Sequence, residues 1–79
     1  LIDKINTELS KITKNKRNKG ETYFLHVHPF VAAYLLQGFP SVRTQWYFKY
    51  QKWIRIIPRH AYRYLEFHFL NKKRKLLRS

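Results

Sequence analysis

The chain has 79 residues, of which 17 are Lys or Arg and only 4 are Asp or Glu, so its formal net charge at pH 7 is +13. This length suits one small domain, and because these residues include no cysteine they hold neither a disulfide framework nor a cysteine-based zinc site. No apolar run reaches the roughly 18 residues that a membrane-spanning helix needs. The charge favours a polyanionic partner such as RNA, although a lysine-rich proteome encoded by an AT-rich genome is another source of such a charge.

The chain starts at Leu1 and contains no methionine, so we expect it to be a fragment of a longer protein. No signal peptide is visible, and we expect a cytoplasmic location. The residues divide into a leading helix with a basic loop (1–19), an α+β core (21–70) and a basic tail (71–79). We expect all three parts to belong to a single small domain.

Residues 2–12 predict an amphipathic helix. Their apolar side chains follow spacings of three, four and three residues, which places them in one stripe along a helix: Ile2, Ile5, Leu9 and Ile12. Because the stripe is narrow and single-sided, we expect this helix to lie on the outside of the core. The polar and basic residues 15–20 have no periodicity and predict a frayed helix end and a loop.

Residues 21–28 predict a β-strand, because successive side chains of a strand point to opposite faces and the apolar ones alternate here. One face would carry Tyr23, Leu25 and Val27, and the other Phe24, His26 and His28. Pro29 ends this strand, since it has no N–H to donate to the ladder.

Residues 29–37 predict a short helix that is apolar nearly all round. Pro29 suits the first helical position, where its missing N–H costs nothing. No polar residue interrupts the run 30–36, and a helix that is apolar on every side is typically a buried one. We therefore expect the rest of the chain to pack around this helix.

The residues that follow predict a helix stop and a new start. Gly38 is expected in the left-handed position after the helix, with Phe39 folding back on the last turn and Pro40 preventing continuation. Ser41 is expected to cap the next helix with its hydroxyl oxygen.

Residues 42–51 predict that next helix, in which Val42, Trp46 and Tyr50 stack along one face. The run 46–48 is aromatic and covers most of the helix circumference. This predicts either two buried faces, or one buried face and one binding face.

Two further strands are expected near the C-terminus. Residues 53–58 are rich in β-branched side chains and end at Pro58. After the connection 59–61, residues 62–70 alternate again: Leu65, Phe67 and Phe69 would share one face, and Tyr64, Glu66 and His68 the other.

The strands predict a small mixed sheet. The second and third are close in sequence and should form an antiparallel hairpin, whereas the first and second are separated by two helices and should pair in parallel through a right-handed crossover. The expected fold is α+β, a three-stranded mixed sheet with helices packed on one face, in the order helix-strand-helix-helix-strand-strand. The tail with its Lys and Arg run, residues 72–75, is expected to be solvated.

Candidate catalytic and metal-binding residues are few. A metal could be ligated by histidine and carboxylate at alternate strand positions, here His26, His28, Glu66 and His68, but solvated histidines at a sheet edge give the same pattern. Glu66 and His68 are also the only close acid–base pair in the strands, and no glycine-rich phosphate loop is present. We predict no catalytic residue and no metal site in these residues.

Cations and aromatic side chains interleave over residues 43–55, as in proteins that hold single-stranded RNA by phosphate contacts and base stacking. The candidate RNA-binding residues are Arg43, Lys49, Lys52, Arg55, Lys72, Lys73 and Arg74. The candidate interface residues are Trp46, Tyr47 and Tyr50. The alternative is that these aromatic side chains are core and the lysines cover the outside.

Three segments together resemble the C-terminal small domain of the ribonuclease E/G family: LHVHPFVAAYLL (25–36), WIRIIP (53–58) and YRYLEFHF (62–69). In that family a strand runs into a V-H-P-like turn and a V-A-x-Y-L-like helix, a later strand ends in I-x-P, and a final strand follows. The resemblance covers residues 1–70, and its form is most similar to ribonuclease G-like proteins of the Bacteroidetes.

The resemblance implies a parent endoribonuclease that cuts single-stranded RNA with Mg²⁺ held by aspartates of a nuclease domain. It also implies an OB-fold RNA-binding domain, a pocket for the RNA 5′ end, and a cysteine-containing zinc link between protomers of a homo-oligomer that the small domain helps to build. None of the catalytic aspartates, zinc cysteines or 5′-pocket residues lies in these residues, so Mg²⁺ and Zn²⁺ belong to the parent.

The expected function is therefore oligomer assembly with auxiliary RNA contact. Two alternatives stay open, a stand-alone basic RNA- or ribosome-associated module and a protein-docking module whose charge is incidental.

Overall fold

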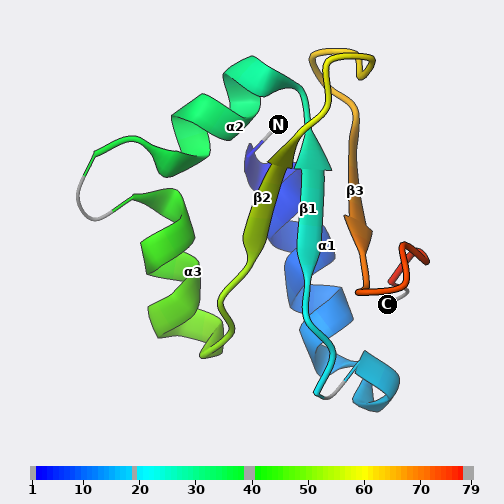
Figure 1. The fold of residues 1–79 in the computed structure, drawn as a ribbon. Coiled ribbons are helices and arrows are strands. Elements are labelled where there is room, and N and C mark those ends of the chain that lie inside the picture. The colour runs from blue at the N-terminus through cyan, green and yellow to red at the C-terminus, as the bar shows by residue number, and fades with distance from the viewer. Residues whose placement is uncertain (1, 19, 39–40, 78–79) are drawn as a thin grey trace.

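A computed structural model describes residues 2–18, 20–38 and 41–77 of the chain (Figure 1). Its elements in chain order are α1 (Ile2–Lys14), the short 3₁₀ helix η1 (Lys16–Asn18), β1 (Phe24–Val27), α2 (Pro29–Leu36), α3 (Val42–Tyr50), β2 (Arg55–Pro58) and β3 (Phe67–Leu70). The three α-helices and three strands follow one another as predicted, and the fold is α+β with a mixed sheet, which confirms the expected class.

The sheet has the strand order β2-β1-β3, so β1 is central. β1 pairs with β2 in parallel, as predicted, and with β3 antiparallel. The predicted hairpin between the second and third strands is therefore wrong. Two turns occupy the connection, closed by bonds from the Tyr62 N–H to the Arg59 carbonyl and from the Glu66 N–H to the Arg63 carbonyl, each 3.1 Å. β3 begins only at Phe67, and this long connection carries it past β2 to the free side of β1.

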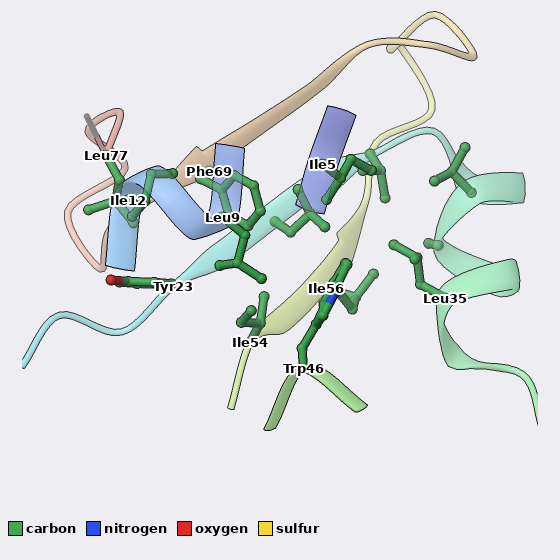
Figure 2. Packing of buried hydrophobic residues seen from close by; sticks show 14 residues of the cluster. Ile5, Leu9, Ile12, Tyr23, Leu35, Trp46, Ile54, Ile56, Phe69 and Leu77 are labelled. Carbon is green, nitrogen blue, oxygen red and sulfur yellow. The ribbon is translucent and has the colours of Figure 1, made fainter. Parts of the chain in front are cut away.

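The core lies between one face of the sheet and the helices (Figure 2). Ile5, Leu9 and Ile12 of α1 are fully buried, which confirms the predicted stripe and its single-sided packing. From the sheet, Leu25 and Phe69 reach the same cluster. The first strand shows the predicted alternation, with its buried side chains on the helix side.

α3 contributes one large side chain to this core. Trp46 is only 3% exposed, and its indole N–H donates a hydrogen bond to the Asn6 side-chain oxygen of α1. Val42 and Tyr50 pack against the cluster from the same face of the helix, as their spacing predicted. The opposite side of α3 is exposed, with Phe48 at 72%.

α2 is not the buried centre that its composition predicts. Val31, Ala32 and Leu35 are buried, and the helix packs on β2, but Phe30 is 72% exposed and Tyr34 is 51% exposed. The prediction of a helix buried all round is therefore wrong. An eight-residue helix that meets the sheet on one side buries only one helical face, and the remaining apolar side chains face outward.

The helix ends confirm the predicted roles of Pro29, Gly38 and Ser41, and His28 caps α2, which was not predicted. The Phe30 N–H donates to His28 Nδ1 at 3.1 Å, Pro29 occupies the first turn of α2, and Gly38 has a φ of +77°. The Ser41 hydroxyl accepts from the Thr44 N–H at 3.2 Å and caps α3. The predicted roles of Phe39 and Pro40 fall outside the described residues.

The segment after β3 folds back instead of extending into solvent. Leu76 forms a β-bridge with Leu70, the Leu77 N–H donates to the Phe69 carbonyl at 2.9 Å, and Leu77 is 8% exposed within the core. The expectation of a solvated tail is therefore wrong at its apolar end, because Leu76 pairs its backbone with β3 while remaining 56% exposed, and Leu77 is buried in the core. The basic residues of the turn itself are exposed.

Candidate nucleic-acid interface

The face of the sheet opposite the core carries a second set of alternating side chains. The strand register aligns them in two rows across the sheet, Arg55–Phe24–Leu70 and Ile57–His26–His68. Arg55 is exposed and the other five are half-buried. We call this surface the open face; it offers aromatic, imidazole and aliphatic groups at the level of the sheet.

A hollow of about 290 Å³ lies on the open face. Its lining consists of Phe24, His26, Ile57, Arg59, Asn71, Lys72 and Arg74. The floor comes from β1 and β2, while three cations come from two loops that follow β2 and β3. The Arg59 N–H donates to the Val27 carbonyl at 2.7 Å, and this bond fixes the loop after β2 beside the central strand.

The turn 71–75 holds the two of its four cations that line the hollow, Lys72 and Arg74, in a defined backbone conformation. The Asn71 side-chain oxygen accepts from the backbone N–H groups of Lys73, at 2.8 Å, and Lys75, at 3.0 Å. The Asn71 N–H donates to the Lys75 carbonyl at 2.8 Å. Arg74 takes the left-handed conformation, with a φ of 64°, which costs a residue with a side chain roughly 1–2 kcal/mol.

The cations of the hollow act on the imidazole of His26, which lies in its lining. Its pKa is lowered, first by burial and then by the positive charges of Arg59 and Arg74 and by His68. None of the four carboxylates of the chain lines the hollow. The open face therefore presents a positive potential above an aromatic and aliphatic floor, which suits an anion that also carries an apolar ring.

One hydrogen bond ties the edge of the open face to the loop before β3. The Tyr62 hydroxyl lies 3.0 Å from His68 Nδ1, and the two rings meet edge to face. Burial, followed by the charge of Glu66, raises the pKa of Tyr62 against an opposing effect of Arg59. The Tyr62 hydroxyl is therefore protonated at neutral pH and keeps His68 in place beside His26.

The predicted RNA-binding residues separate into two groups. Arg55, Lys72 and Arg74 lie on the open face or line its hollow, and Lys73 lies on the same turn without lining the hollow. The structure thus brings together residues that are far apart in the sequence.

The other three predicted cations lie against aromatic rings of the α3 region. The Arg43 guanidinium lies 4.3 Å from the centre of the Trp53 ring, and the Lys49 ammonium lies 5.4 Å from that of Tyr50. Lys52 donates to the Glu21 carbonyl at 2.7 Å and lies over the Tyr23 ring. The Arg43 contact joins α3 to the loop that follows it, the Lys52 contacts join that loop to the segment before β1, and the Lys49 contact lies within α3.

The predicted interface residues also differ from one another. Trp46 is buried in the chain's own core and offers no surface to a partner, so its prediction as an interface residue is wrong. Tyr50 is half-buried beneath Lys49. Only Tyr47 is exposed, and its ring contacts Phe48 and Trp53 edge to face.

The four candidate metal ligands do not converge. His28 caps α2, and a Glu66 carboxylate oxygen accepts from the Arg63 N–H at 3.1 Å. His26 and His68 are cross-strand neighbours. Among residues 2–18, 20–38 and 41–77, no three His, Cys, Asp or Glu side chains are grouped to hold a metal ion.

Sequence reasoning missed four residues of the hollow as site residues: Phe24 and Ile57 of its floor, and Arg59 and Asn71 of its loops. Arg59 directly follows the proline that ends β2, which is a recognisable place for a loop residue at a sheet edge. Asn71 begins a turn because its side-chain oxygen accepts a hydrogen bond from the backbone N–H two residues later. Asparagine commonly begins turns in this way, so its position is a recognisable turn signal. Neither signal indicates that side chains of these two loops, which lie at opposite ends of the sheet, line one hollow.

No protein-family model, curated protein or solved structure matches this chain. Within the part of the chain that the structure describes, no helix has the length and apolar character needed to cross a membrane.

Proposed function

We propose that this chain is the C-terminal small domain of a ribonuclease E/G-type endoribonuclease, where it contacts RNA and contributes to a homo-oligomer without performing the cleavage. The segments 25–36, 53–58 and 62–69 support the family assignment. In such a parent the nuclease aspartates with their Mg²⁺ and the cysteine link with its Zn²⁺ belong to other domains, and the protein works in the cytoplasm.

One observation carries the RNA contact: three cations from two separate loops surround an aromatic and aliphatic hollow on the open face. Single-stranded nucleic acid is held by cations that follow the phosphates and by aromatic surfaces on which bases stack. The net charge of +13 adds long-range attraction for the same partner.

The test is binding of a fluorescein-labelled single-stranded RNA of about a dozen nucleotides, followed by fluorescence anisotropy from about 50 to 300 mM salt. If three phosphates are neutralised, the logarithm of the association constant falls with the logarithm of salt concentration with a slope of about −2. RNA left intact in the presence of Mg²⁺ is the second expected result. Cleavage, or binding that ignores salt, contradicts the proposal.

The family assignment has its own test. The gene upstream of this coding segment is expected to encode a nuclease domain with paired aspartates and a cysteine-containing link. A gene without them ends the ribonuclease assignment and leaves a stand-alone RNA-binding or ribosome-associated module as the alternative.

A protein-docking role is the second candidate, and the exposed apolar side chains of α2 and α3 favour it. Phe30 and Phe48 are the most exposed of them, and Tyr34 is exposed as well. Alanine at Phe30 and Phe48 discriminates the two roles: loss of a homo-oligomer in sedimentation with unchanged RNA affinity favours docking, and the reverse favours an RNA contact there.

A further inference from the structure

The hollow on the open face offers the two kinds of surface that bind a nucleotide, an apolar floor for the base and a cationic wall for the phosphate. Phe24 and Ile57 form part of its floor, on adjacent strands. Arg59, Lys72 and Arg74 form its cationic wall. A base offers a flat apolar face and its phosphate a negative charge, and the two sit a ribose apart within one nucleotide.

We propose that this hollow is a subsite for one unpaired nucleotide of single-stranded RNA, its base against Phe24 and Ile57 and its phosphate between Arg59 and Arg74. This rests on the proposed RNA contact and specifies the place and the form of RNA. The remaining cations of the chain then attract RNA without positioning it.

The shape of the hollow favours an unpaired nucleotide over a duplex. Its volume of about 290 Å³ lies just below the usual range for the sites of drug-sized ligands. Only a base that is not stacked within a duplex can lie against the floor. Paired bases keep their faces covered, so a duplex offers the hollow phosphates alone. Stacking on an aromatic ring adds an attraction that the duplex lacks.

His26 is expected to make binding at the subsite depend on pH, which distinguishes it from diffuse electrostatic attraction. Ile57 of β2 and His68 of β3 flank it in the register, with the Tyr62 hydroxyl bonded to His68, and the charges of Arg59 and Arg74 act on it from the two loops. A phosphate between the two arginines brings a negative charge close to the imidazole and favours its protonated form. Binding at this subsite therefore takes up a proton, and affinity rises as pH falls below neutral.

The experiment compares matched variants with a labelled single-stranded oligouridylate and with an RNA hairpin of equal charge. Arg74→Gly removes a cation from the wall, and Lys73→Gln removes one from the same turn outside the wall. Arg59→Gln and Lys49→Gln form a second pair, and Phe24→Leu is matched by Phe48→Leu on the other surface. Circular dichroism confirms that each variant is folded.

The expected result is a loss of at least about fivefold in affinity for the single strand with Arg74→Gly, Arg59→Gln and Phe24→Leu, from the usual strength of such contacts, and less than about twofold with the three controls. The hairpin binds more weakly than the oligouridylate and is insensitive to Phe24→Leu. His26→Gln abolishes the rise of affinity between pH 7 and pH 5.5.

Two outcomes of the RNA-binding measurements overturn the subsite. If Lys73→Gln and Lys49→Gln weaken binding as much as the wall variants, RNA is attracted diffusely, and the proposed function survives without a subsite. If the unmodified chain does not bind the oligouridylate at all, both proposals fall. Uridine 5′-monophosphate titrated into the ¹⁵N-labelled unmodified chain is independent of any variant: shifts confined to the hollow support the subsite, and shifts spread over all lysines oppose it.

Discussion

The open face and the α3 region contain the same residue types and use them in opposite ways. Around α3, Arg43 and Lys52 lie over the rings of Trp53 and Tyr23, and the aromatic side chains belong partly to the core. On the open face, Arg59 and Arg74 border a hollow whose floor includes the half-buried side chains of Phe24 and Ile57. The difference teaches that an interleaved basic and aromatic sequence does not by itself show which of its cations contact the chain's own rings and which border an open hollow. What surrounds each cation in three dimensions decides its role.

The largest expected effect is on the α3 side of this comparison. Trp46→Ala removes a buried ring and its hydrogen bond to Asn6, so the free energy of unfolding is expected to fall by about 3–5 kcal/mol. Urea denaturation measures it. Trp46→Phe is the control, losing the hydrogen bond and part of the ring. A stable Trp46→Ala protein would show that Trp46 is not a core residue and would restore it as an interface candidate.

Lys52 tests whether the cations around α3 are structural. Lys52→Gln removes the bond to the Glu21 carbonyl and the contact with the Tyr23 ring, so stability is expected to fall by about 1 kcal/mol. RNA affinity should change less than with Arg74→Gly. Both are measured on the same preparation, by denaturation and by anisotropy. An unchanged stability with a large loss of RNA affinity would reverse the assignment of the two regions.

Arg74 is expected to show effects of opposite sign. Its φ of 64° is natural for glycine and strained for arginine, so Arg74→Gly is expected to raise the free energy of unfolding by about 0.5–1 kcal/mol while RNA affinity falls. Lys73→Gly, at a neighbouring position of the turn without this φ, should not stabilise. If Arg74→Gly destabilises the domain, the arginine side chain contributes to the fold and the strain argument is wrong.

The smallest expected effect is a pH dependence of stability. Burial, Arg59, Arg74 and His68 lower the pKa of His26 in the folded state, so below the ordinary histidine value of about 6.5 the unfolded chain binds more protons than the folded one. Stability is then fully present above that value and is lost as pH falls through the lowered pKa. Thermal unfolding between pH 7.5 and 5 measures it, and His26→Gln should show a shallower decline. Equal slopes would remove His26 as the cause.

Local features of the fold were predictable because they depend on neighbours in the sequence. The stripe of α1, the Ser41 cap and the left-handed Gly38 each follow from a few adjacent residues. The pairing of β3 with β1 was not predictable in this way, since proximity in sequence favours a hairpin with β2. Nor does an apolar helix as short as α2 show which of its sides meets the sheet.

The candidate site was predictable only in pieces. Arg55 was expected from the interleaved cations and aromatic side chains, and Lys72 and Arg74 from the basic run. Arg59 and Arg74, however, are 15 positions apart and line one hollow only because β3 lies on the far side of β1. His26 was noticed as a possible metal ligand, and its position between two arginines depends on the same strand order. The site is therefore a property of the sheet topology more than of any motif.

The central position of β1 has a consequence for the order in which the domain is built during synthesis. Its partners are residues 55–58 and 67–70, and the core closes with Leu77. During synthesis β1 leaves the ribosome before both of the strands that flank it in the sheet. It therefore has no pairing partner until β2 and β3 have also emerged. Such non-local pairing carries a large loop-closure cost and slows folding. Folding of this domain is therefore expected to begin only after nearly all of its residues have left the exit tunnel.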